Sequence, residues 1–107
     1  MSDIPSVDND NFANEIGDSS AAVLDFYATW CGPCKTIAPI VEDLAETYSQ
    51  QGLKFGKVDI DQASELALKF QIEGVPTLIF FKDGEPVDKL VGAYPRQIIE
   101  DKVKGLL

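Results

Sequence analysis

The sequence predicts a single α/β domain in which a mixed β-sheet is flanked by helices. Apolar runs alternate with helical segments, and strand–helix–strand units of this kind give parallel strands with right-handed crossovers. The run at 21–28, Ala-Ala-Val-Leu-Asp-Phe-Tyr-Ala, is apolar apart from one acid, as expected of a strand buried on both faces. The chain has 107 residues, of which 45% are hydrophobic. That is enough for one core, so we expect one domain over residues 1–107.

The first half of the chain has the pattern of three strands and two helices. In chain order these are strand 4–7, helix 10–16, strand 21–28, helix 33–50 and strand 53–59. Pro5 confines the first strand to a sheet edge, because proline has no N–H to donate. Asp8, Asn9 and Asp10 offer caps for the first helix. Pro39 lies inside the second helix, where it removes one hydrogen bond.

The second half adds a helix, a β-hairpin and a last helix. In chain order these are helix 62–70, strand 78–81, strand 87–91 and helix 95–106. Asp61 or a neighbour should cap the first of them. Lys82-Asp83-Gly84-Glu85 has the composition of a hairpin turn, and Pro86 suits an edge strand. The total is a five-stranded sheet with four helices, in which the central strands are parallel and the hairpin adds an antiparallel edge.

The charge of the chain argues against two classes of partner. Eighteen acidic residues against nine basic ones give a net charge of −9, which disfavours nucleic acid and anionic membrane surfaces. There is no run of about 18 apolar residues, so no transmembrane helix is expected. Residues 1–5 have neither a basic nor an apolar leader segment, so we expect no signal peptide and a cytoplasmic protein.

The stretch 30–35, Trp-Cys-Gly-Pro-Cys-Lys, holds both cysteines and the only tryptophan. Two thiols separated by two residues can close a small disulfide ring, and Gly-Pro fits a turn that enters a helix. Cys31 lies at the start of that helix, where free amides and the helix dipole stabilise the thiolate that attacks disulfides. Lys35 adds a positive charge one turn on. We therefore expect Cys31 to be the exposed nucleophile and Cys34 to be a more buried resolving thiol.

Two other interpretations of the cysteine pair remain open. They could be ordinary buried cysteines, although this leaves their spacing to chance. They could also form half of a zinc site, but zinc usually needs four ligands, and the chain has no histidine and no second Cys-x-x-Cys. Permanent disulfides are uncommon in a reducing compartment, so a catalytic or metal-binding pair is favoured over a structural bond. A redox pair without a metal is the favoured interpretation of the two, because the further zinc ligands are missing.

Asp25 is an acid in the middle of an apolar strand. A buried carboxylate without a partner is costly when charged, so we expect burial to raise its pKa. It lies six residues before Cys31 and could accept a proton from the deeper thiol, directly or through a water. Lys57 on the next strand is a plausible partner. The alternatives are a structural ion pair without a catalytic task, and a bulge that turns Asp25 to water.

Pro76 precedes the strand at 78–81, and X-Pro bonds in tight turns can be cis. The residues alone leave the isomer open. A cis bond would offer the Val75 backbone as an edge for an extended partner chain. Small and apolar residues from three parts of the chain could form a docking patch: Trp30, Gly32, Pro33, Val75, Pro76 and Gly92. Alternatively, Trp30 packs in the core.

These features together resemble the thioredoxin family over essentially the whole chain. The features concerned, in chain order, are the strand Val23–Tyr27 with Asp25, the motif at 30–35, Pro39, Lys57 with Val58-Asp59-Ile60-Asp61, Val75-Pro76-Thr77, Phe81-Lys82-Asp83-Gly84 and Val91-Gly92-Ala93. Two positions depart from the common pattern. Tyr27 stands where many members have tryptophan, and Thr29 precedes Trp30 where an acid or proline is common. Neither departure removes a catalytic group.

The resemblance implies a fold, an activity and a set of partners. The fold would be a central mixed sheet flanked by helices, and the activity the reduction of protein disulfides. Cys31 would attack, Cys34 would resolve, Asp25 would be the buried acid–base group beside Lys57, and Pro76 would be a cis-proline. A thioredoxin reductase would regenerate the dithiol from NADPH or ferredoxin, so this chain would bind no cofactor. Clients would be disulfide-containing proteins such as reductases and peroxidases, and the chain would be a monomer.

Two rival functions stay open on the sequence. Disulfide oxidases and isomerases share the fold but commonly carry a histidine between the cysteines, which makes the disulfide more oxidising. Gly32-Pro33 supplies no such group, so we expect a reducing potential. The other rival is a binding module in which the apolar patch holds a partner and the thiols are incidental.

Overall fold

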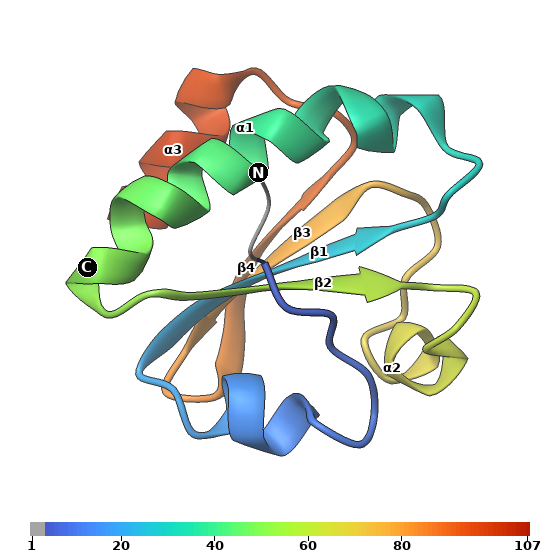
Figure 1. Ribbon diagram of the computed structural model, residues 1–107, viewed down its shortest axis with the longest axis horizontal. Coiled ribbons are helices and arrows are strands. Elements are labelled where there is room, and N and C mark those ends of the chain that lie inside the picture. Colours follow the sequence, from blue (N-terminus) through green and yellow to red (C-terminus); the bar gives the residue numbers. More distant parts are fainter. Residues whose placement is uncertain (1–3) are drawn as a thin grey trace.

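The computed structural model describes residues 4–107 and shows a sheet between two layers of helices (Figure 1). The strands are β1 (Ala21–Tyr27), β2 (Lys54–Asp59), β3 (Thr77–Lys82) and β4 (Glu85–Val91). Their order across the sheet is β2-β1-β3-β4. β1 pairs parallel with β2 and antiparallel with β3, and β4 completes an antiparallel hairpin. The fold class is therefore the predicted mixed sheet with helices.

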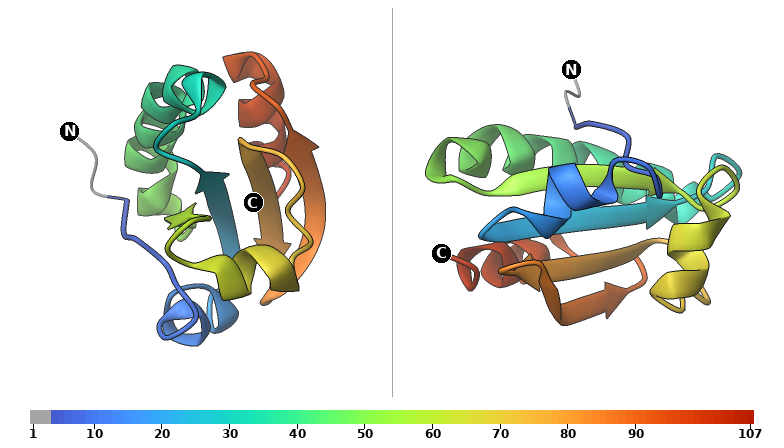
Figure 2. Two further views of the ribbon diagram at one scale, coloured as in Figure 1. Left: turned by 90° about the vertical axis from the view of Figure 1, so that its right-hand side faces the viewer. Right: turned by 90° about the horizontal axis from the view of Figure 1, so that it is seen from below.

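The helical segments differ in kind and length. They are the π-helix η1 (Ala13–Gly17), α1 (Gly32–Tyr48), the 3₁₀ turn η2 (Ser49–Gln51), α2 (Ser64–Lys69) and α3 (Arg96–Lys104). Figures 1 and 2 show α1 and α3 on one face of the sheet, with η1 and α2 on the other side. Among the described residues, no helix has both the length and the apolar composition needed to cross a bilayer.

The predicted first strand is a single bridge, so residues 4–107 contain four strands in place of the predicted five. Ser6 forms an isolated parallel bridge with Lys57 at the outer edge of β2. Lys57 donates to the Pro5 carbonyl and accepts from the Val7 amide, but Pro5 itself has no N–H with which to extend the ladder. The expectation of no leader at residues 1–5 concerns Met1–Asp3 as well, and these lie outside the described residues.

Two predicted helices begin later than expected. The first is a π-helix over 13–17 instead of an α-helix over 10–16, and its preceding turn is capped by Asp8, whose Oδ1 accepts from the Asp10 and Asn11 amides. The expected cap by Asp61 is wrong. α2 begins at Ser64 without a side-chain cap, and the carboxylate of Asp61 has another partner, described below. With η1 a π-helix, three α-helices replace the predicted four within residues 4–107.

The expectation that the central strands are all parallel is wrong for β3. A parallel return needs a connection long enough to recross the sheet, usually a dozen residues or more. α1 has 17 residues and makes that return from β1 to β2. α2 has only 6 residues and lies at the end of the sheet where β2 ends (Figure 1). β3 therefore starts at that end and runs antiparallel to β1.

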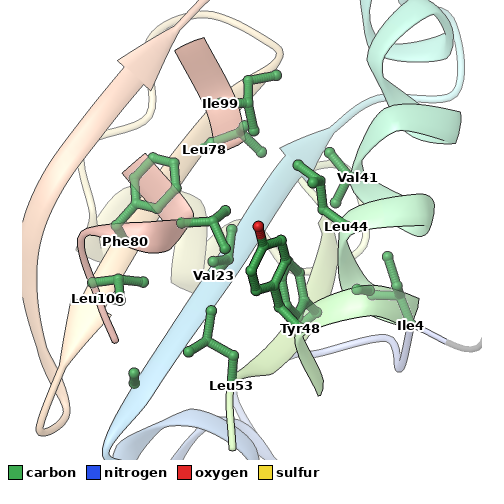
Figure 3. Close-up of a cluster of buried hydrophobic side chains, with 14 of the residues drawn as sticks. Ile4, Val23, Val41, Leu44, Tyr48, Leu53, Leu78, Phe80, Ile99 and Leu106 are labelled. Atoms are coloured by element: carbon green, nitrogen blue, oxygen red, sulfur yellow. The ribbon is translucent and has the colours of Figure 1, made fainter. Parts of the chain in front are cut away.

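β1 is buried on both faces, as its apolar run predicts. Alternate residues face opposite sides of a strand, so Ala21 and Val23 join the cluster under α1 and α3, whereas Ala22, Leu24 and Phe26 join the cluster on the other face. Figure 3 shows the first cluster, in which Val41 and Leu44 of α1 approach Val23 from one side and Ile99 and Phe80 approach from the other. The predicted buried stripe of α1, which is Ile37, Val41, Leu44 and Tyr48, is confirmed.

The hairpin between β3 and β4 is a two-residue loop. Asp83 and Gly84 both have positive φ, at 53° and 81°, which matches the Asp-Gly preference of type I′ turns. A Cβ at position 84 would lie 2.7 Å from the Gly17 carbonyl oxygen, so a side chain there would force the backbone apart. β4 is the edge strand, as predicted.

Candidate active site

The cysteine pair sits where β1 passes into α1. Cys31 is the N-cap of α1, and its amide donates to the Ala28 carbonyl at 3.2 Å. A disulfide joins Cys31 to Cys34. Sγ of Cys31 accepts from the Cys34 amide at 3.1 Å, so this sulfur occupies the place of a capping oxygen at the positive end of a long helix. α1 begins at Gly32, one residue before the predicted start, and Pro33 lies in its first turn, as predicted.

The two cysteines do not differ in burial. We expected Cys34 to be the more buried, but each residue is 4% exposed. Their neighbours do differ. Cys34 lines a pocket of about 290 Å³ together with Asp25 and Lys57, whereas Sγ of Cys31 lies 3.7 Å from the Val75 carbonyl oxygen. The two cysteines therefore differ in the groups that surround them and not in exposure.

Asp25 is the buried acid of the site. It is 7% exposed, and its Oδ1 accepts no hydrogen bond from residues 4–107. Burial raises the pKa of Asp25 to about 7, against an opposing pull from the positive charge of Lys57. Lys57 stands directly across the parallel ladder from Asp25. The expectations of a raised pKa and a nearby Lys57 are confirmed, and a bulge that exposes Asp25 is excluded by its burial.

The Val75–Pro76 peptide bond is cis, as the resemblance implied. The loop around it is held by two hydrogen bonds: the Gly92 amide donates to the Pro76 carbonyl at 2.8 Å, and the Thr77 hydroxyl donates to the Gly74 carbonyl at 2.7 Å. Val75 packs against the cysteine cluster. The segments 74–77 and 92 therefore border the disulfide from the β3–β4 side.

The residues of the predicted docking patch differ in exposure. Trp30 is 68% exposed, so the alternative that it packs in the core is wrong. Gly32 and Pro33 are also exposed, and Val75 and Gly92 are half-buried. Pro76 is buried, so it shapes the loop without adding surface. The exposed apolar surface of the patch therefore comes mainly from Trp30 and Pro33.

The sequence analysis named Asp61 as a possible helix cap and missed its contact with Trp30. Its Oδ2 accepts from the indole N–H of Trp30 at 2.9 Å, which restrains an exposed ring. The signal available in the sequence was the indole N–H itself, which usually finds an acceptor. Spacing could not identify that acceptor, because positions 30 and 61 meet only when β1 and β2 pair. Ile60 and Tyr27, which pack against the cysteine cluster, were missed for the same reason.

The family model for thioredoxin matches residues 3–105. The chain belongs to the thioredoxin family. It is 45% identical over 101 residues to a thioredoxin of Staphylococcus saprophyticus, covering 94% of this chain and 95% of that one. A thioredoxin of Staphylococcus haemolyticus is 48% identical over 94 residues, or 88% of each chain.

Solved thioredoxin structures match the whole architecture. That of Malassezia sympodialis superposes with a TM-score of 0.87 at 34% identity, covering 100% of this chain and 94% of that one. Mitochondrial thioredoxin 3 of Saccharomyces cerevisiae, in its oxidised form, gives 0.86 at 33% identity, covering 95% and 94%. With its Cys31–Cys34 disulfide, this thioredoxin is a protein-disulfide oxidoreductase that carries electrons by thiol–disulfide exchange.

The described part of the chain has no cluster of side chains that could bind a metal ion. Residues 4–107 contain no group of three His, Cys, Asp or Glu side chains placed to hold a metal ion. The cysteines are instead bonded to each other, which is the arrangement that the redox interpretation predicted and the zinc half-site did not.

Proposed function

We propose that this thioredoxin reduces disulfides in client proteins, with Cys31 as the attacking thiolate and Cys34 as the resolving thiol. The observation that carries this assignment is the position of Cys31 as the N-cap of α1, with the Cys34 amide directed at its sulfur. A thiolate there gains from the helix dipole and from an N–H donor. The sulfur of Cys34 lies one helical turn further on and has no such position.

The exchange then proceeds in two displacements. The Cys31 thiolate attacks one sulfur of the client disulfide, forming a mixed disulfide and releasing the first client thiolate. Cys34 loses its proton and attacks Sγ of Cys31, which closes the Cys31–Cys34 disulfide and releases the second client thiolate. The client gains two electrons and takes up two protons, while this chain loses two electrons and is oxidised.

Asp25 is the group proposed to take the proton from Cys34. The two side chains line the same pocket, and Oδ1 of Asp25 accepts no hydrogen bond from the described part of the chain. A carboxylate with a pKa of about 7 is matched to proton transfer near neutral pH. Lys57 supports the ionised form of Asp25 through its charge.

Client chains would dock on the patch around the disulfide. Trp30, Gly32 and Pro33 supply its exposed part on one side of the sulfurs, and Val75, Pro76 and Gly92 supply the other side. An extended client segment could pair with the backbone at Val75, whose carbonyl already lies beside Sγ of Cys31. A flat apolar surface with few side-chain requirements would accept many sequences.

The remaining parts of the function concern partners and setting. A thioredoxin reductase would return the disulfide to the dithiol, with NADPH or ferredoxin as the source of electrons, and this chain would need no bound cofactor. It would act as a monomeric single domain over residues 1–107 in the cytoplasm. The net charge of −9 favours reductases and clients with a basic rim around their own cysteines.

Two cysteine variants test the assignment. Cys31→Ser should abolish reduction of insulin disulfides, because no nucleophile remains to form the mixed disulfide. Cys34→Ser should instead trap clients covalently on Cys31, seen as adducts on non-reducing gels that dithiothreitol removes. If Cys34→Ser captured nothing, the binding-module function would be favoured. If the measured potential of the pair were as high as that of the glutathione pool, an oxidase or isomerase would be the better assignment.

A further inference from the structure

Charged residues form a row on one face of the paired strands β1 and β2. Asp25 faces Lys57 across the parallel ladder, and Tyr27 faces Asp59. Alternate residues of a strand point to the same side, so all four side chains lie on the face covered by α1. By strand geometry, Lys57 is about 4.8 Å from the backbone of β1 and about 6.6 Å along β2 from Asp59. Lys57 therefore has two carboxylate neighbours.

Lys57 is not held by either carboxylate. Within residues 4–107 the ion pairs shorter than 4.0 Å all involve Arg96 or Lys102. Lys57 is half-buried, and its long, flexible stem can turn the ammonium group toward Asp25 or toward Asp59. Asp59 is also half-buried, so it is a less hydrated and more attractive partner than a fully exposed acid would be.

Other charged groups around Asp25 come from the neighbouring elements. α1 contributes Lys35 and Glu42 to the same pocket. The β3 residue opposite Asp25 is Leu78, which has no charge. On the far side of Tyr27, Asp8 lines a second pocket together with Asp59. Among these groups, Lys57 is the cation in register with Asp25, and Asp59 is the acid next to Lys57 on the same strand.

The position of the Lys57 ammonium matters because Coulomb attraction falls with distance. When the ammonium turns toward Asp25 it favours the ionised carboxylate, and when it turns toward Asp59 this pull weakens. Two opposing effects act on Asp25: burial raises its pKa, and the positive charge of Lys57 opposes that rise. Negative charge at Asp59 also reaches Tyr27, where it helps to raise the pKa of the phenol.

We propose that Asp59 is a positioning residue for thiol–disulfide exchange, which attracts the Lys57 ammonium and so limits its pull on Asp25. Asp25 thereby keeps the capacity to accept a proton near neutral pH. This inference rests on the proposed role of Asp25 as proton acceptor. Asp59 touches neither sulfur in this arrangement and acts only through Lys57.

The direct test is an NMR titration of the Asp25 carboxyl carbon in the oxidised protein, in which the cysteines do not titrate. Asp59→Asn should lower the pKa of Asp25 by about half a pH unit, because Lys57 is then free to approach it. Asparagine keeps the side-chain oxygen that accepts from the Asp61 amide at 2.9 Å, so the local turn should survive. The matched control is Asp61→Asn, which neutralises a carboxylate bound to Trp30 instead and should shift Asp25 much less.

A Lys57→Gln background distinguishes an effect of Asp59 that acts through Lys57 from direct repulsion between the Asp25 and Asp59 carboxylates. There, Asp59→Asn should no longer move the titration of Asp25. An equal shift with and without Lys57, or no shift in Asp59→Asn itself, would overturn the proposal. Lys57→Gln alone supplies a second measurement that does not depend on the folding of Asp59→Asn. It should raise the pKa of Asp25, because the opposing positive charge is removed, and an unchanged pKa of Asp25 would also overturn the proposal.

Kinetics distinguish this inference from the function on which it rests. If Asp25 accepts the proton, the pH profile of insulin reduction should move to lower pH in Asp59→Asn by the same amount as the titration. If the titration of Asp25 moved but the pH profile of the rate did not, Asp59 would still position Lys57. Asp25 would then not be the proton acceptor in the exchange. Asp59→Glu, which restores the carboxylate, should return both curves toward those of the unmodified protein.

Discussion

Two carboxylates near opposite ends of α1 have pKa values shifted in opposite directions. Near its start, Asp25 of β1 lines the pocket with one oxygen that has no hydrogen-bond partner among residues 4–107, and burial raises its pKa to about 7. At its far end, Glu100 of α3 accepts from the Tyr48 hydroxyl at 2.6 Å and pairs with Arg96. These contacts, led by the Tyr48 hydrogen bond, lower the pKa of Glu100. The same chemical group is stabilised in its charged form at one end and destabilised at the other.

The two carboxylates differ in role: Glu100 joins two helices, whereas Asp25 is a candidate proton acceptor. The Glu100 network, which Arg96 extends to Asp43 of α1, joins the two helices that cover one face of the sheet. Every charged member has a partner, so the network holds structure and offers no reactive group. Asp25 has the opposite character, because a carboxylate that lacks partners costs stability but can take up a proton at neutral pH.

Asp25→Asn should have the largest effect on stability, because it removes the carboxylate whose pKa is raised by burial. The unfolded chain ionises Asp25 near pH 3.8, whereas the folded protein ionises it near pH 7. The cost to stability therefore grows as pH rises between these values and is complete above pH 7. The variant should gain up to about 4 kcal/mol in the free energy of unfolding at pH 8, and almost nothing near pH 3. Denaturant unfolding of the oxidised protein across this range measures the difference.

The same variant should lose activity where it gains stability. With no carboxylate to take the proton from Cys34, insulin reduction should slow about tenfold or more above pH 7. Glu100→Gln is the matched control, since it also neutralises an acid near α1 but should leave the exchange rate unchanged. A gain in stability without a loss of rate would make Asp25 a structural residue only.

Tyr48→Phe should have a smaller effect of the opposite sign. It keeps the ring in the core and removes the hydroxyl that donates to Glu100. The thermal midpoint should fall by roughly 4 °C at pH 7. Because the pKa of Glu100 is lowered in the folded protein, this contribution should be present above the ordinary glutamate pKa and disappear as pH falls through the folded value. Calorimetry at pH 7 and pH 3 checks both parts, and an equal loss at both would assign the effect to packing.

Lys102→Gln should have the smallest effect. Lys102 pairs with Asp88 at 2.6 Å between α3 and the edge strand β4, and both side chains are about two-fifths exposed. Exposed pairs are screened by water and salt, so the free energy of unfolding should change by no more than about 0.5 kcal/mol. Urea unfolding at low and high salt would reveal a larger or salt-independent loss, which would show that the pair is better shielded than its exposure indicates.

Most of the fold could be predicted from local pattern. The apolar run at 21–28 identified a strand buried on both faces, and the spacing from Ile37 to Tyr48 identified the buried stripe of α1. Asp83-Gly84 identified the hairpin. The direction of β3 could not be predicted in this way, because it depends on whether α2 is long enough to recross the sheet, and the predicted helix at 62–70 was longer than the observed one.

The candidate site was also predictable only where local sequence decides it. The motif at 30–35 favoured redox chemistry over a zinc half-site, since two thiols at that spacing at a helix start can close a disulfide and the chain has no histidine and no second Cys-x-x-Cys. Asp25 was identifiable because an acid in an apolar strand is anomalous. The equal burial of Cys31 and Cys34 was not predicted, because exposure depends on the loops that cover each sulfur.

By itself, then, the sequence determined which groups are candidates for the reaction, since residue type and local spacing set nucleophilicity, helix position and turn geometry. Only the tertiary structure decided what those groups meet. The register of β1 and β2 brings Lys57 opposite Asp25, and the same pairing brings Asp61 within 2.9 Å of the Trp30 indole. Such contacts join positions about thirty residues apart, and they form only because α1 returns the chain across the sheet so that β2 pairs with β1.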